Sequence, residues 1–325
     1  MRKIGITTTV PVEIIYAAGL VPVDLNNVFI TAENRSQLVE EAETAGYPRN
    51  TCAWIKGIYG VLCRHPEIST VVAVTQGDCS NTHALMETLQ LRGVEVVPFA
   101  YPWDRDYATL QLAMEKLAGH FGADHTAVEA ATRRLDGVRE LVWELDRLVG
   151  EENLGTGLVD HLYQVNCSDF RGDPESFAAA VKAETERMAG AGPLAPELRL
   201  GYLGVPPIVD DFYEYLEDQG ARVVFNEVQR QFTLPWLHQD LVERYRRYTY
   251  PYGIFFRLED IEREAARRRL DGVVHYAQSF CFRQIEDMII RKKLRLPVLT
   301  LEGDRPGVMD ARTRLRLDAF LDMLR

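Results

Sequence analysis

Two stretches of the sequence, VVAVTQGDC at residues 71–79 and VVHYAQSFC at residues 273–281, share a pattern that constrains the fold. In each stretch an apolar run is followed by a Gln and, three residues later, by a Cys, and the copies are 202 residues apart from Cys79 to Cys281. A short apolar run that gives way to polar residues predicts a buried parallel strand that ends in a loop. The repeat therefore predicts two similar α/β domains, each presenting a cysteine where a strand ends.

The sequence around both copies alternates between short apolar runs and helical patterns, as parallel α/β domains do. Residues 106–190 differ, because charged and apolar residues recur there at helical spacing with few β-branched runs. We therefore expect an N-terminal α/β domain over 1–105, a helical region over 106–190 and a C-terminal α/β domain over 191–325. The predicted fold class is α/β, with two similar doubly wound parallel-sheet domains and an intervening helical region.

Individual elements are also predicted. We expect a strand over 94–97 that Pro98 ends, and Asn50 or Thr51 as the cap of a helix that carries Trp54, Ile55, Ile58, Val61 and Leu62. The other expected elements are helices over 12–18, 83–91 and 209–218 and strands over 20–25, 71–74 and 222–225.

Charge and composition exclude several classes of function. The 325 residues carry a net charge of -11, which argues against nucleic acid as a partner because phosphate binding draws on a basic face. No apolar run reaches the ~18 residues of a membrane span, and the start lacks the apolar stretch of a signal peptide, so we expect a cytoplasmic protein without a membrane partner. No GxxxxGK[ST] loop occurs, so ATP hydrolysis is expected on another protein.

Three of the five cysteines are candidates for metal ligands. Cys79 and Cys281 follow predicted strands, and a cleft between the two domains could bring them together. Cys52 lies at a predicted helix start, where backbone N–H groups stabilise a thiolate. Three thiolates from separate loops are a plausible iron-sulfur site, although their spacing is unlike that of a ferredoxin.

Zinc is the chemical alternative, because three Cys and one His form a common zinc site. His83 and His275 are the nearest candidates for the fourth ligand, and His83 is also a candidate for a position beside the metal. The sequence leaves iron and zinc open. Cys63, with apolar neighbours on a predicted helix, and Cys167, in the helical region, are expected to be structural.

Three further polar residues are candidates for the site. Glu13 opens a helix near the predicted cleft and could accept a proton or bind substrate as a catalytic residue, or could be a first-turn carboxylate favoured by the helix dipole. Gln76 and Gln278, the repeated pair, could donate hydrogen bonds to a cluster or substrate, or could satisfy loop backbone groups.

With these residues in place, the chain resembles the 2-hydroxyacyl-CoA dehydratase and benzoyl-CoA reductase family, in particular the D-component subunits of 2-hydroxyglutaryl-CoA dehydratase. The resemblance covers both α/β halves, and its motifs are specific in combination and order. They are VPVEIIYAAGLVPVDL, TCAWIKG, VTQGDCSNT, GARVVFNE, RLDGVVHYAQSFCFRQIED and LPVLTLEGDRPGVMDARTRLRLDAFLDML.

The resemblance implies a 4Fe-4S cluster held by three cysteines between the domains, with one iron open to water or a substrate oxygen. Cys52, Cys79 and Cys281 match the ligand positions of the family, whereas Cys63 and Cys167 match none. The implied reaction is that of a hydro-lyase, the radical elimination of water from a 2-hydroxyacyl-CoA. One transient electron from a separate ATP-hydrolysing activator makes the otherwise unreactive β-proton acidic.

The implied partners are an acyl-CoA substrate, the activator, and either a homologous second subunit or a second copy of this chain. Two other functions stay open. One is an ATP-linked reduction in the same family, like that of benzoyl-CoA reductase. The other is a non-catalytic iron-sulfur protein that transfers electrons.

Overall fold

The computed structural model describes residues 1–236 and 240–325. The chain divides into two compact units, each made of three segments: unit 1 comprises Met1–Glu140, Asn166–Phe177 and Leu234–Gly253, and unit 2 comprises Leu141–Val165, Ala178–Thr233 and Ile254–Arg325. Two long helices, α7 (His125–Glu151) and α9 (Pro174–Ala191), contribute residues to both units. The domain boundaries predicted at residues 105 and 190 stay predictions.

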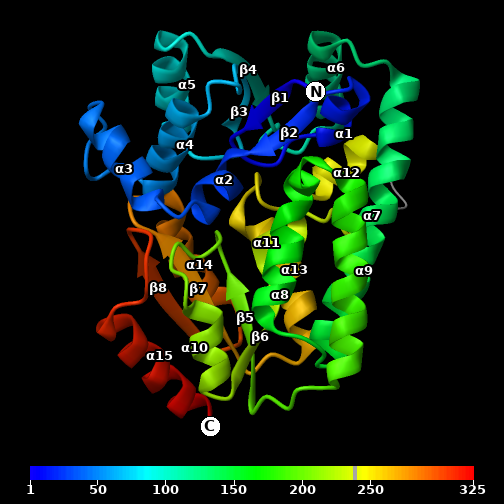
Figure 1. Ribbon diagram of the computed structural model, residues 1–325. Coiled ribbons are helices and arrows are strands. Elements are labelled where there is room, and N and C mark those ends of the chain that lie inside the picture. Colours follow the sequence, from blue (N-terminus) through cyan, green and yellow to red (C-terminus); the bar gives the residue numbers. More distant parts are fainter. Residues whose placement is uncertain (237–239) are drawn as a thin grey trace. The chain divides into compact units, whose positions relative to one another are not determined.

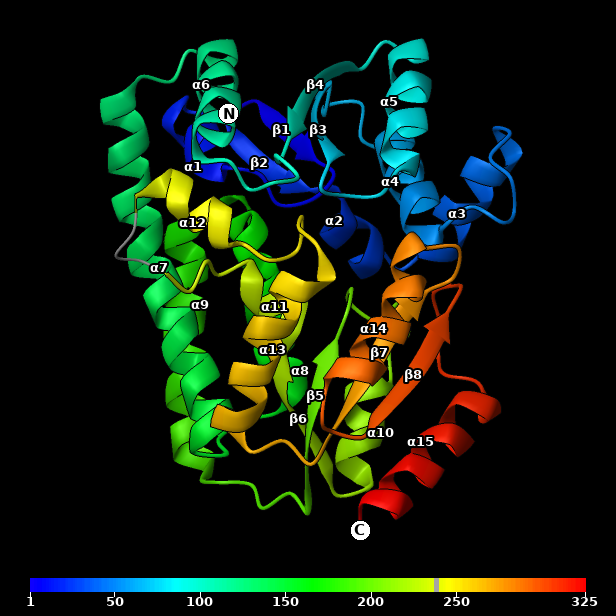
Figure 2. The same ribbon diagram turned by 180° about the vertical axis from the view of Figure 1, so that it is seen from behind.

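Unit 1 contains a parallel sheet with the strand order β2-β1-β3-β4 (Figure 1). Figures 1 and 2 show α4 and α5 on one side of this sheet and α1 and α6 on the other. Its strands are β1 (Lys3–Ile6), β2 (Val21–Asp24), β3 (Thr70–Gln76) and β4 (Glu95–Ala100). Its helices include α1 (Val12–Ala17), α2 (Leu25–Thr31), α3 (Arg35–Thr44), α4 (Ala53–Arg64), α5 (Asn81–Leu91), α6 (Tyr107–Phe121), α12 (Leu241–Arg247) and the short turns η1 (Asn166–Ser168) and η2 (Phe170–Gly172).

Unit 2 repeats this arrangement with the strand order β6-β5-β7-β8, again parallel. Figure 2 shows α13 and α14 in front of this sheet, and Figure 1 shows α10 and α15 on its other face. Its strands are β5 (Leu198–Leu203), β6 (Ala221–Asn226), β7 (Gly272–Gln278) and β8 (Val298–Gly303). Its helices include α8 (Gly157–Val165), α10 (Phe212–Asp218), α11 (Glu227–Gln231), α13 (Ile254–Arg268), η3 (Phe282–Glu286), α14 (Asp287–Lys293) and α15 (Ala311–Leu324).

The repeat found in the sequence is a repeat of structure. Strands β3 and β7 begin and end 202 residues apart, at 70 and 272 and at 76 and 278. The pairing with the next strand keeps the same separation, because Val71 faces Val96 in unit 1 and Val273 faces Val298 in unit 2. A one-residue slip would have turned the side chains to the other face, so the shared register confirms two similar doubly wound domains.

A glycine occupies the same place in both sheets, on the first strand of the unit at a position that pairs with the third strand. Gly5 faces Val71 and Gly201 faces Val273. A Cβ added to Gly201 would lie 2.7 Å from Leu270 Cδ1 and 3.1 Å from Val273 Cγ1, whereas one added to Gly5 would find its nearest neighbours at 3.1 Å. A side chain would therefore be tight at Gly5 and would displace Leu270 at Gly201.

We expect G201A to destabilise unit 2 by about 1–3 kcal/mol, because the new methyl group overpacks the space beside Leu270. Urea unfolding measures the loss. The control is G190A in α9, where nothing lies within 4 Å of an added Cβ and alanine favours the helix by up to ~1 kcal/mol. Equal stability of G201A and the parent protein would contradict the close approach.

The predicted end of the fourth strand at Pro98 is wrong. β4 runs from Glu95 to Ala100 and contains Pro98, which pairs with Ala73. The strand tolerates a proline because β4 is the outermost strand of its sheet, where a missing N–H breaks no ladder. The predicted helical region, which follows the first sheet and precedes the second along the chain, is confirmed by α6, α7, α8 and α9.

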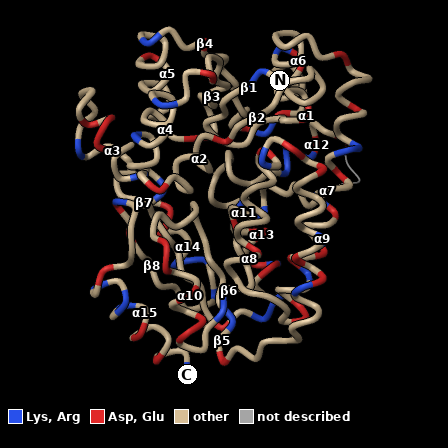
Figure 3. The backbone as a smooth tube through the Cα atoms, viewed as in Figure 1, with Lys and Arg blue, Asp and Glu red and all other residues tan. Residues whose placement is uncertain are grey.

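Charges of both signs are spread over the structure. Figure 3 shows Asp and Glu interspersed with Lys and Arg in each unit. None of the helices in the described part of the chain is both long and apolar enough to cross a membrane.

Two buried carboxyl groups connect the η1–η2 segment to the sheet of unit 1. Asp24, at the end of β2, caps α2 and is fully buried, and its backbone N–H donates to Asp169 Oδ2 over 2.8 Å. Burial, and then the charge of Asp24, raise the pKa of Asp169 to about 7, although the N–H groups of Asp24 and Arg171 oppose this shift. Protonation of Asp169 therefore removes the cost of burying its charge beside Asp24.

We expect the free energy of unfolding of the parent protein, compared with that of D169N, to fall as the pH rises from 4 to 8. The folded pKa of Asp169 lies above the unfolded value, so its contribution is complete below about pH 4 and is lost as the pH rises through about 7. The difference can reach ~4 kcal/mol. Urea unfolding of both proteins at pH 5, 6, 7 and 8 measures it, and a constant difference over this range would contradict the shift.

Candidate functional site

The strand order places a topological switch point at the same position in each sheet. In unit 1 the chain reverses direction across the sheet between β1 and β3, and in unit 2 between β5 and β7. Open α/β sheets bind ligands at the carboxyl ends of the two strands that flank such a switch point. Cys79 follows β3 and Cys281 follows β7, so each of these cysteines stands at the switch point of its own sheet.

The loop that carries Cys79 is fixed closely in unit 1. Gly77 has a φ of +99°, and a Cβ there would lie 2.5 Å from Pro251 Cβ, so only glycine fits. The carbonyl of Cys79 accepts a hydrogen bond from the N–H of Thr82 over 3.0 Å in the turn that leads into α5. The thiol of Cys79 is half-buried.

Cys52 belongs to the same unit and occupies the N-cap position of α4. The predicted caps, Asn50 and Thr51, are therefore wrong, because the helix begins at Ala53, one residue later than a cap at Thr51 requires and two later than a cap at Asn50 requires. The carbonyl of Cys52 accepts from the N–H of Lys56 over 3.2 Å. Since the chain runs from the end of α4 to the start of β3, the N-terminus of α4 faces the carboxyl edge of the sheet.

In unit 2, Cys281 lies in a tight turn between β7 and η3. Its N–H donates to the carbonyl of Gln278 and its own carbonyl accepts from the N–H of Gln284, both over 3.1 Å. Phe280, which precedes it, has a φ of +65°, a strained conformation for an aromatic residue, and its side chain is half exposed. The thiol of Cys281 is half-buried.

The other predicted residues lie in different surroundings. Gln278 is buried, accepts from the Tyr276 hydroxyl and donates to the Asp304 carbonyl, each over 2.9 Å, whereas Gln76 is exposed. The exposed ring of His83 has its Nε2 2.9 Å from the carbonyl of Thr75. The role of these side chains beside a metal stays a prediction.

Cys63 lies near the end of α4 and Cys167 lies in η1. Burial raises the pKa of the Cys63 thiol, and the deeper burial of Cys167 raises its pKa to about 12. Both environments disfavour a thiolate, and the assignment of these two cysteines as structural stays a prediction.

The three candidate ligands are divided between the units, with Cys52 and Cys79 in unit 1 and Cys281 in unit 2. Among the residues that the structure describes, no three His, Cys, Asp or Glu side chains form a group that could hold a metal ion. The donor chemistry of three thiols, each beside a sheet's carboxyl edge, nevertheless fits an iron-sulfur cluster. The ligand set and the choice between iron and zinc stay predictions.

Glu13 is held in a buried ion pair of unit 1. Its carboxylate is fully buried in the first turn of α1, 2.7 Å from Nη2 of the equally buried Arg139, and accepts from the Tyr245 hydroxyl over 2.9 Å. The Tyr245 hydroxyl also lies 3.0 Å from the carbonyl of Val10. Sequence patterns could not reveal this pair, because its partners lie 126 and 232 residues away.

We expect E13Q to lose about 3 kcal/mol or more of unfolding free energy, because it leaves the Arg139 charge buried without its closest carboxylate. Urea unfolding measures the loss. The control is E175Q, which breaks the exposed pair with Arg134 in the same unit and should cost under about 1 kcal/mol. If E13Q is as stable as E175Q, the pair is not structural and a catalytic role for Glu13 gains support.

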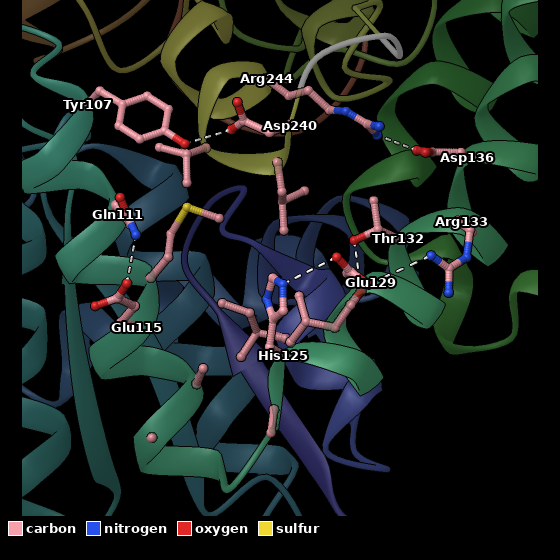
Figure 4. A pocket seen from close by; sticks show the side chains of 18 residues that line it. Tyr107, Gln111, Glu115, His125, Glu129, Thr132, Arg133, Asp136, Asp240 and Arg244 are labelled. Carbon is pink, nitrogen blue, oxygen red and sulfur yellow. Dashed lines mark hydrogen bonds and ion pairs between the residues drawn. The ribbon is translucent and has the colours of Figure 1, made fainter.

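Unit 1 also contains a groove of about 670 Å³ between α6, α7 and α12, which Figure 4 shows from close by. Apolar side chains such as Ile14 and Met114 form part of its wall, and the pairs Arg244–Asp136 and His125–Glu129 lie at its rim. None of the predicted site residues lines the groove.

Comparison with known proteins assigns the chain to a protein family. The family model for 2-hydroxyglutaryl-CoA dehydratase, D-component, matches residues 7–324. No curated protein sequence gives a significant match.

Proposed function

Because the chain belongs to the family of 2-hydroxyglutaryl-CoA dehydratase D-components, we propose that it is the iron-sulfur subunit of a 2-hydroxyacyl-CoA dehydratase. It binds one 4Fe-4S cluster through Cys52, Cys79 and Cys281. The net reaction removes water from a 2-hydroxyacyl-CoA, and a separate ATP-hydrolysing activator supplies the transient electron.

The observation that carries this proposal is the equivalent position of Cys79 and Cys281. In two sheets with the same strand order and register, a cysteine stands three residues after the end of the third strand, beside the switch point. A structural cysteine has no reason to recur at the edge where ligands bind, since free cysteines are usually buried in cores.

The residues of the chain prepare the thiols for metal binding. The N-terminus of α4 favours the thiolate form of Cys52. Turn hydrogen bonds hold the N–H and the carbonyl of Cys281 and the carbonyl of Cys79. When bound, a cluster with one open iron supplies a Lewis acid for the thioester carbonyl or the leaving hydroxide and a relay for one electron. The remaining partners are the acyl-CoA and a homologous subunit or a second copy of this chain.

We expect C79S and C281S to lose most of the iron, because a serine oxygen is a poorer ligand than a cysteine thiolate for the iron of a cluster. The protein is purified without oxygen, and iron, sulfide and zinc are measured together with the absorbance in the visible range. C63S is the matched control and should keep its iron, because Cys63 lies near the C-terminal end of α4, the opposite end of this helix from Cys52. A colourless parent protein that contains zinc would contradict the cluster.

Turnover separates the functions that a cluster alone leaves open. The loaded protein is combined with an ATP-hydrolysing activator and candidate 2-hydroxyacyl-CoA esters, and the unsaturated product is measured. Reduction of an aryl-CoA instead of loss of water would favour the reductase of the same family. An intact cluster that gives no turnover with any ester would favour a non-catalytic electron carrier.

A further inference from the structure

The turn that carries Cys281 is attached to a buried arginine on another helix of unit 2. Arg257 on α13 is 1% exposed and grips Glu227 with two hydrogen bonds, from Nε to Oε1 and from Nη2 to Oε2, each of 2.9 Å. Its third nitrogen, Nη1, pairs with Glu286 Oε2 at the end of η3. Arg257 therefore connects α11 to the turn that follows Cys281.

Glu227 extends this network to the loop after β5. Its Oε2 also accepts the N–H of Gly204 over 3.0 Å. Burial alone would raise the pKa of Glu227, but the charge and hydrogen bonds of Arg257 hold it below its ordinary value. The carboxylate is therefore ionised at neutral pH and fixes Arg257 in place.

Glu286, the second carboxylate that pairs with Arg257, also contacts the turn that carries Cys281. Arg283, two residues after Cys281 and itself buried, donates from Nη1 to Glu286 Oε1 over 3.2 Å. The two oxygens of Glu286 thus join Arg257 to Arg283, and through Arg283 to the backbone beside Cys281.

The turn needs such support because its backbone is strained. Phe280 has a φ of +65° immediately before Cys281, which costs about 1–3 kcal/mol for a residue of this kind. From the side of β8, Glu302 accepts from the Ser279 hydroxyl over 3.1 Å and from the Gln284 amide over 3.0 Å. The Arg257 network holds the opposite end of the turn.

The Arg257 network has no counterpart in unit 1 at the position of Glu227. Asp24 and Asn226 hold equivalent places at the ends of the second strands, since each lies beside the residue that follows the close-packed glycine. The next residue is Leu25 in unit 1 and Glu227 in unit 2. The ion pair is therefore a feature of the Cys281 turn and not of the shared fold.

We propose that Arg257, acting through Glu286, is a positioning residue that holds the strained Cys281 turn in the geometry for metal binding. This inference rests on the proposed function, in which Cys281 is a cluster ligand. It adds that the buried ion pair, in addition to the strand end, determines where this thiol stands.

Two variants test the proposal with different risks to folding. E286A removes the branch to the turn and leaves the Arg257–Glu227 pair intact, and R257K keeps the charge but loses the two-pronged grip on Glu227. The matched control is D146A, which removes one of two carboxylates from the buried Arg268 and leaves Glu264 on it. E286Q keeps one acceptor oxygen but turns an amide NH2 toward the second arginine, so it should behave between E286A and the parent protein, which distinguishes the contact from a general loss of packing.

The first measurement uses the metal-free protein and therefore does not depend on the cluster. Alkylation by iodoacetamide is followed separately at Cys281 and Cys79 by mass spectrometry. We expect E286A and R257K to accelerate alkylation of Cys281 by roughly tenfold, because loss of the support lowers the free energy of local opening. Alkylation of Cys79 in unit 1 should stay unchanged, and D146A should alter neither rate.

The second measurement uses the protein loaded with iron and sulfide. We expect the same two variants to shift the electron paramagnetic resonance signal of the reduced cluster and to release iron to a chelator several-fold faster than D146A. Equal alkylation and release in E286A, R257K and the control would overturn the proposal. A parent protein that binds no cluster would contradict the proposed function, while the alkylation rates would still decide whether Arg257 holds the turn.

Discussion

The pairing of the third and fourth strands is the constraint on which the rest of the structure depends. In each unit it fixes where the third strand ends and therefore where Cys79 or Cys281 stands. The side chains alternate between the faces of the sheet, so a slip of one residue would bury polar groups and move the cysteine to the other face. Beside the third strand, Gly5 and Gly201 leave room on the face of each sheet for neighbouring apolar side chains.

The sequence was sufficient for the features that depend on local patterns. The two sheets, their similarity and the position of both strand-end cysteines follow from period, from the apolar runs and from the repeat itself. The continuation of β4 through Pro98 could not be predicted in this way, because it depends on the strand being at the edge. The N-cap of α4 was missed because Asn50 and Thr51 have better capping side chains than Cys52, and the helix start was fixed by packing instead.

The buried ion pairs mark the limit of sequence interpretation. Arg139 and Arg257 sit in basic or mixed segments that look like solvated helix faces, yet both are almost fully buried against carboxylates. Their partners are distant in the chain, and no composition or spacing connects them. Such pairs often add little net stability over apolar packing, but they penalise any arrangement in which one partner is left alone. Movement of Glu13 or of the Cys281 turn would leave a buried arginine without a carboxylate partner, and this energetic penalty keeps both in place.

Pro98 has a further consequence for the exposed edges of the two sheets. An edge strand offers unpaired backbone groups to any other strand, and Pro98 removes a donor from the middle of β4. The position 202 residues later is Thr300 in β8, whose carbonyl accepts from Arg316 of α15 over 2.7 Å. The two halves therefore protect the same point of the same edge by different means, one by deleting a donor and the other by covering an acceptor. In the folded protein, each edge strand therefore offers one backbone group fewer to a strand from another molecule.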